Sequence, residues 1–120
     1  MPLCIDCQHY ANLTNKSTGG GVFFSIEEFR EWRAQGNREC FYCGCDGEEL
    51  YRRNMKNVRT KKRYEVVGVD RVDNALPYTL QNIVPCCGPC NSVRGGILSH
   101  AEMLLLAPLL EGIWSARERH

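Results

Sequence analysis

Cys40-Phe41-Tyr42-Cys43 and Cys87-Gly88-Pro89-Cys90 are two matched cysteine pairs that enclose a long polar segment of the chain. Each pair has the two-residue spacer that lets both thiolates reach one tetrahedral ion. The second pair runs directly into Asn91, at the expected start of a helix. We therefore predict a structural Zn²⁺ site that clamps the intervening segment, and its four thiolate ligands are Cys40, Cys43, Cys87 and Cys90.

The remaining cysteines leave a second metal site open as an alternative. Cys4 and Cys7 have the same two-residue spacing and form a possible half-site. Two of His9, Cys45 and Cys86 would have to complete it. Free thiols are the ordinary explanation for such residues, and Cys86 is expected to pack as a small apolar residue.

The length of 120 residues predicts one domain that gains much stability from a metal ion. Eight cysteines also fit a secreted disulfide protein, but the opening Met1-Pro2-Leu3-Cys4 has no features of a secretory leader. We therefore expect a reducing, cytoplasmic location. The longest apolar run, 103–110, is too short to span a bilayer, so no membrane association is expected.

The charge distribution favours a polyanionic partner, although the net charge is only +1. Seven of the twelve residues from 52 to 63 are basic and none is acidic. Such a cluster is typical of a nucleic-acid interface, and the alternative is a solvated basic loop. The predicted phosphate-contacting residues are Arg52, Arg53, Lys56, Arg59, Lys61, Lys62 and Arg63.

Capping and periodicity signals divide the chain into three parts, 1–37, 38–96 and 97–120, of one domain. Ser25 with Glu28, and Ser99 with Glu102, are capping boxes that predict two helices, the first of which ends at Gly36. Pro108 is expected to kink or restart the second helix. Between the cysteine pairs the pattern predicts strands over 64–69 and 81–84, and a short helix from residue 88 or 89 to 94, closed by Gly95-Gly96.

The middle part carries a family resemblance in the stretches Val69-Asp70-Arg71-Val72-Asp73-Asn74 and Asn82-Ile83-Val84-Pro85-Cys86-Cys87, followed by Cys90-Asn91 and Arg94. Together with the first cysteine pair, these elements resemble the zinc-containing HNH endonucleases, also called ββα-metal or His-Me finger nucleases. The resemblance covers residues 38–96. It implies an α+β chain with a small, zinc-stapled, treble-clef-like ββα-metal fold and flanking helices.

The resemblance also implies a metal-dependent DNA endonuclease, of a kind found in phages, that hydrolyses phosphodiester bonds in duplex DNA. By position, Asp70 and Asn91 would bind one catalytic Mg²⁺ or Mn²⁺, ions that prefer hard oxygen ligands. Asn82 would tie the hairpin loop together through backbone hydrogen bonds. Arg94 would hold a phosphate.

Arg71 departs from the family, which places a histidine general base directly after the aspartate. A guanidinium stays protonated and offers no acceptor, so Arg71 cannot act as that base, although it can clamp a phosphate. Asp73, Glu65 and His100 are the alternative bases, although turn or surface roles are the favoured explanation for each of them. A zinc-stabilised nucleic-acid-binding module without catalysis is therefore the alternative function. A thiol-exchange protein is a remote third, because the βαβ setting is absent.

Overall fold

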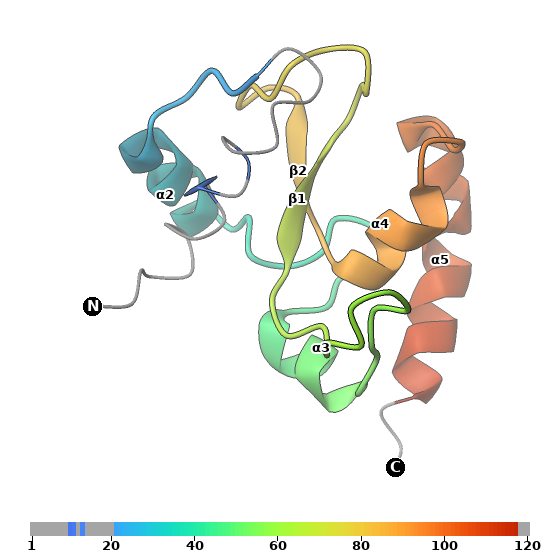
Figure 1. Ribbon diagram of the computed structural model, residues 1–120. Helices are drawn as coiled ribbons and strands as arrows, with labels where there is room; N and C mark the ends of the chain where they lie inside the picture. Colours follow the sequence, from blue (N-terminus) through green and yellow to red (C-terminus); the bar gives the residue numbers. More distant parts are fainter. Residues whose placement is uncertain (1–9, 12, 14–20, 118–120) are drawn as a thin grey trace.

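In residues 21–117, the fold is a strand–strand–helix unit with three further helices beside it (Figure 1). A computed structural model describes residues 10–11, 13 and 21–117. The sheet consists of two antiparallel strands, and α4 follows the second strand directly. This arrangement confirms the α+β class. In chain order the elements are α2 (Ile26–Ala34), α3 (Gly47–Arg52), β1 (Gly68–Arg71), β2 (Ile83–Cys86), α4 (Gly88–Arg94) and α5 (His100–Ala116).

Pro85 lies inside β2, whereas the strand predicted from the sequence covered 81–84 and so ended before it. The register pairs Val69 with Pro85 and Asp70 with Val84. The backbone N–H of Val72 donates to Asn82 O at 2.8 Å, so Val72 and Asn82 form a hydrogen-bonded pair. In an antiparallel ladder, hydrogen-bonded and non-hydrogen-bonded pairs alternate, so the Val69–Pro85 pair is a non-hydrogen-bonded one. Pro85 therefore needs no N–H at this position.

The first strand begins at Gly68, four residues later than the predicted strand over 64–69. Two side chains explain the difference. The carbonyl of Val67 accepts a hydrogen bond from Arg33 Nη2 at 2.8 Å, which takes it out of any ladder. The ring of Tyr64 packs so closely over Gly88 that a Cβ there would lie 2.1 Å from it.

The helix termini follow the sequence signals. Both predicted capping boxes are present, at Ser25 for α2 and at Ser99 for α5. Gly95 ends α4 with φ +51°, a conformation that glycine adopts without a steric penalty. α5 continues through Pro108 as one helix, so the predicted restart does not occur. None of the described helices is long and apolar enough to cross a membrane.

Two clusters of buried side chains form the core. One surrounds the paired cysteines and receives Met103, Leu110 and Trp114 from α5. The other surrounds Phe29 of α2 and includes Ile83 of β2. The hairpin therefore lies between the two clusters, and the cysteine cluster fixes α4 and α5 beside it.

Candidate functional site

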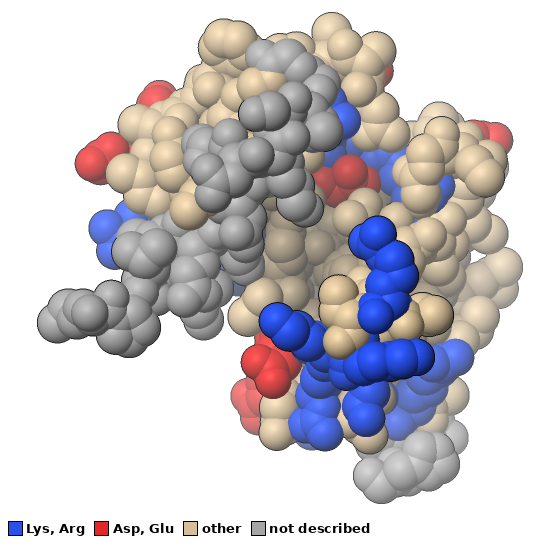
Figure 2. Space-filling model, in the orientation of Figure 1, with Lys and Arg blue, Asp and Glu red and all other residues tan. Residues whose placement is uncertain are grey.

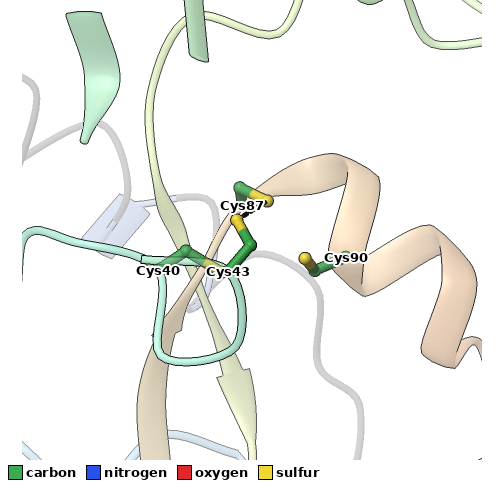
Figure 3. A group of neighbouring side chains, drawn as sticks. All are labelled: Cys40, Cys43, Cys87 and Cys90. Carbon is green, nitrogen blue, oxygen red and sulfur yellow. Dashed lines mark hydrogen bonds between the residues drawn. The ribbon is translucent and has the colours of Figure 1, made fainter. Parts of the chain in front are cut away.

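The four predicted ligands Cys40, Cys43, Cys87 and Cys90 lie together in the first core cluster (Figure 3). All four are buried, and their Sγ atoms lie within 4.8 Å of one another. Sγ of Cys43 and Cys87 are 3.7 Å apart, close to the ~3.8 Å that tetrahedral Zn–S bonds of ~2.3 Å give. The predicted four-cysteine metal site is therefore confirmed in its geometry, and a set of four thiolates suits Zn²⁺.

Two local features shape this site. A tight turn carries the first pair: Gly44 N donates to Cys40 O at 2.8 Å, with Gly44 at φ +78°. The second pair opens α4, so its thiols project from the first helical turn. Hydrogen bonds with neighbouring thiols, chiefly Cys40, lower the pKa of Cys43, whereas hydrogen bonds with Cys40 and Cys43 raise the pKa values of Cys87 and Cys90.

Cys45 and Cys86 are buried beside this cluster but are not part of the candidate metal site. A hydrogen bond with Cys43, reinforced by burial, raises the pKa of Cys45 to about 12, so it remains a thiol. Cys86 is 2% exposed, as expected for a small apolar residue. Cys4, Cys7 and His9, the other part of the alternative site, lie outside the described residues.

Asp70 of β1 is held by an ion pair with Arg94 of α4. Asp70 Oδ2 accepts from Arg94 Nη1 at 2.7 Å, and Asp70 Oδ1 accepts from the backbone N–H of Arg71 at 2.8 Å. The side chain of Asp70 is 13% exposed and that of Arg94 is 2% exposed. The carboxylate is therefore fixed in orientation where β1 ends, facing α4.

Arg94 does not have the phosphate-holding role predicted for it. Its guanidinium also donates to the carbonyls of Arg71, Val72 and Leu98, the last two at 2.8 and 3.0 Å. A buried side chain with these four hydrogen bonds joins α4 to the end of β1 and has little surface left for a ligand. The prediction is wrong because α4 turns this residue into the protein.

Asn91 lies one helical turn before Arg94 on α4 and is exposed. Residues three apart in a helix lie on neighbouring parts of one face. Asn91 therefore lies on the same side of α4 as Arg94, the residue that contacts Asp70, and its side chain is open to solvent. Shared coordination of an ion by Asp70 and Asn91 stays a prediction.

Asn82 has the hydrogen bonds expected of a loop-tying residue. Its Oδ1 accepts from the N–H of Asp73 at 2.9 Å, and its Nδ2 donates to the carbonyls of Asp73 and Pro77 at 3.1 and 3.0 Å. The side chain is 8% exposed. It therefore fixes the loop between β1 and β2.

Arg71, at the position where the resemblance predicts a general base, is directed toward this loop. Its Nη1 donates to Leu76 O at 3.2 Å, and its guanidinium carbon lies 4.9 Å from the centre of the Tyr78 ring. The side chain is partly exposed. These contacts use only part of the five N–H donors of the guanidinium.

Of the three alternative bases, Asp73 and Glu65 have turn and surface positions, whereas His100 lies beside a groove. Asp73 Oδ1 accepts from Ala75 N–H at 2.9 Å, as in an Asx turn, and Glu65 is exposed before the strand begins. His100 borders a groove of about 530 Å³, which the β1–β2 loop and Arg94 also line. Its Nδ1 lies 2.8 Å from Tyr42 Oη, and burial, with the charge of Arg94, lowers its pKa.

The basic segment forms a surface patch beside α3 and the following loop (Figure 2). Arg53 is not part of it: the side chain is 5% exposed, and its Nη1 donates to Cys43 Sγ at 3.5 Å. Arg52 is exposed but pairs with Glu48 at 3.0 Å. The other predicted residues are exposed or partly exposed; these are Lys56, Arg59, Lys61, Lys62 and Arg63.

The patch is connected to α4. Tyr64 Oη lies 3.2 Å from Asn57 Nδ2 and 3.3 Å from Oγ of Ser92, the residue after Asn91. A cavity of about 350 Å³ lies between this loop and the helices, lined by Lys56, Tyr64 and Ser92 among others. The basic patch and the exposed part of α4 therefore form one continuous surface.

No protein-family model matches the chain, and no curated protein matches it significantly. Among solved structures, the rare-cutting HNH restriction endonuclease PacI, in a study of its mechanism of DNA perturbation, superposes with a TM-score of 0.83. The two sequences are 29% identical, and the match covers 98% of this chain and 84% of that one.

Proposed function

The chain belongs, by its motifs and its fold, to the HNH endonuclease family, and we propose that it is a metal-dependent DNA endonuclease that hydrolyses phosphodiester bonds. The observation that carries this proposal is the orientation of Asp70. Its carboxylate is fixed toward α4, the helix that carries the exposed Asn91 and whose Ser92 lies 3.3 Å from Tyr64 beside the basic patch. Asp70 also stabilises the fold through Arg94, so the proposal depends on its combination with Asn91, a second oxygen donor of the kind that Mg²⁺ or Mn²⁺ prefers.

The oxygen donors of Asp70 and Asn91 fit Mg²⁺ or Mn²⁺, and the thiolate cluster fits Zn²⁺. A divalent ion held by this oxygen pair would supply charge neutralisation at a scissile phosphate. Arg94 and the Arg71 N–H fix the orientation of the Asp70 carboxylate. The basic patch would hold the duplex in register through its phosphates.

A zinc-stabilised DNA-binding module is the second candidate, and Arg71 is the observation that favours it. Arginine cannot take a proton from water, and Arg71 instead contacts Leu76 O and the Tyr78 ring. In the proposed enzyme, either a residue such as His100 or the bound ion must activate the water. The module would bind duplex DNA and leave it intact.

The two candidates are separated by a supercoiled-plasmid assay with zinc-loaded protein in EDTA, Mg²⁺ and Mn²⁺. If the protein is an endonuclease, the plasmid is cleaved with Mg²⁺ or Mn²⁺ and stays intact in EDTA. Asn91→Ala should abolish cleavage without a loss of thermal stability, because Asn91 is exposed. Asn91→Asp is the matched control, since it keeps an oxygen ligand. An inactive wild-type protein that still binds the plasmid would establish the binding module.

A further inference from the structure

The basic patch contains a short hairpin, residues 56–63. An isolated antiparallel bridge pairs Lys56 with Arg63, and the backbone N–H of Asn57 donates to Lys62 O at 2.9 Å. The loop beyond these pairs is therefore the tip of a short two-stranded ribbon. A ribbon of this kind is one of the elements that the major groove of duplex DNA admits.

Hydrogen bonds within the tip of this basic hairpin hold it in one conformation. Asn57 Oδ1 accepts from the backbone N–H groups of Arg59 and Thr60 at 2.9 and 3.1 Å, as in an Asx turn. The backbone N–H of Lys61 donates to Asn57 O at 2.9 Å. A preformed tip loses little conformational freedom on binding, so it can hold its side chains accurately against a ligand.

Lys61 adopts a backbone conformation that disfavours a residue with a side chain. Its φ is +63°, in the left-handed region that glycine enters without a steric penalty. Strain of this kind occurs where a side chain is needed for function. The side chain of Lys61 is exposed, as are those of Arg59 and Lys62, so the strained residue adds a cation to a tip that is already basic.

Val58 is an apolar side chain among these cations, and it is 84% exposed. A lone exposed valine is ordinary on a protein surface, but this one lies at the tip of a fixed, basic ribbon. A tip that contacted only phosphates would gain nothing from valine, which has no hydrogen-bond donor. The apolar group that the major groove presents is the C5-methyl of thymine.

We propose that the basic hairpin enters the major groove of duplex DNA and that Val58 reads sequence there by packing against thymine methyl groups. The cations around Val58 contact the phosphates that border the groove, which positions the tip without reading sequence. This inference deepens the proposed function and rests on it, because it takes DNA as the partner.

Tyr64, the residue after the basic hairpin, connects the hairpin to the candidate site. Its Oη lies 3.3 Å from Oγ of Ser92, the residue after Asn91. Its ring packs over Gly88, the first residue of α4. The base pairs under the tip would therefore lie at a fixed distance from a phosphate at the candidate site, as sequence-specific cleavage requires.

The test measures binding by the zinc-loaded full chain without Mg²⁺ or Mn²⁺. Preferred duplexes are selected from a random library, and each thymine of the preferred site is then replaced by uracil, which lacks only the C5-methyl. We expect at least one replacement to weaken binding about fourfold, the effect of one buried methyl group. Val58→Ala should weaken binding to the thymine duplex at least as much, and in this variant the same replacement should have no further effect.

Two matched controls are available. Val66→Ala, at a 40% exposed residue outside the basic hairpin, should keep the preference for thymine. Lys61→Gly should relieve the strained backbone without lowering the melting temperature, and yet weaken binding to every duplex. Asn54→Gly, at φ +51° before the basic hairpin, should leave binding unchanged.

The inference is overturned by a wild-type chain that binds no duplex, selects no sequence or is indifferent to uracil. A Val58→Ala variant that keeps the thymine preference, or a Lys61→Gly variant that binds as the wild type does, also overturns it. Failure of the nuclease function has a different signature. The wild-type chain would then bind with the thymine preference and leave a plasmid that contains the site intact with Mg²⁺.

Discussion

Asp70→Ala is expected to destabilise the protein strongly, in addition to any effect on catalysis. The substitution removes the partner of Arg94, whose side chain is 2% exposed and lies 2.7 Å from the carboxylate. Breaking one side of a buried ion pair leaves an uncompensated charge and costs about 3–5 kcal/mol. The three carbonyl acceptors of Arg94 remain, so the lower part of this range applies.

For a domain of this size, each kcal/mol corresponds to roughly 4 °C in melting temperature, so Tm should fall by about 12–16 °C. Calorimetry and urea denaturation of zinc-loaded protein would measure both quantities. Asp73→Ala is the control, because that carboxylate is exposed in the adjacent loop.

A double-mutant cycle with Arg94→Met isolates the pair from the other contacts of each residue. The cycle should give a coupling energy of at least about 1.5 kcal/mol, as for hydrogen bonds between charged groups. A Tm change of Asp70→Ala no larger than that of Asp73→Ala, or a coupling energy near zero, would refute this view of the site. Asp70→Asn, which keeps the side-chain volume, is the better variant for activity measurements.

Three further outcomes are expected. Cys90→Ser should release the bound zinc, measured by mass spectrometry, and abolish the cooperative melt, because structural zinc contributes about 10–16 kcal/mol to folding; a melt like that of the wild type would exclude a structural role. Changing Lys56, Arg59 and Lys62 to Gln should reduce the slope of log K for duplex binding against log salt concentration by about 0.9 per lost phosphate contact. Arg30→Gln, on α2, should leave this slope unchanged. Equal slopes in both variants would exclude the patch from the DNA interface. The pKa of His100 is lower in the folded protein than in the unfolded chain, so at falling pH the unfolded chain binds the proton more readily. The free energy of unfolding should therefore fall as pH drops below about 6.5. His100→Gln should show a smaller loss of Tm between neutral and acidic pH, and an identical loss would contradict this assignment.

The metal cluster and the capped helices could be predicted because their signals are local. Two-residue spacers between cysteines, and Ser–Glu pairs three residues apart, specify geometry within one turn of chain. The same local signal would have found α3, which the sequence analysis missed. Asp46 and Glu49 form a capping box there, with both hydrogen bonds present at 3.1 and 2.8 Å.

The roles of two arginines could not be predicted, because they depend on contacts between distant parts of the chain. Arg53 and Arg94 belong to basic or family motifs in the sequence, yet both are buried in the fold. Arg94 meets Asp70, 24 positions away, only after α4 packs beside the hairpin. Burial of this kind follows from tertiary packing, which overrides what charge patterning indicates at the surface.

The central claim is that Asp70 and Asn91 hold a divalent ion separate from the thiolate cluster. Titration of Mn²⁺ into zinc-loaded protein with a short duplex, followed by electron paramagnetic resonance of the free ion, tests it most directly. We expect one Mn²⁺ per chain, lost in Asn91→Ala, bound more weakly in Asp70→Asn, which removes the anionic ligand, and retained in Asn91→Asp. Mn²⁺ binding that is absent from the wild type, or unchanged in Asn91→Ala, would contradict the account.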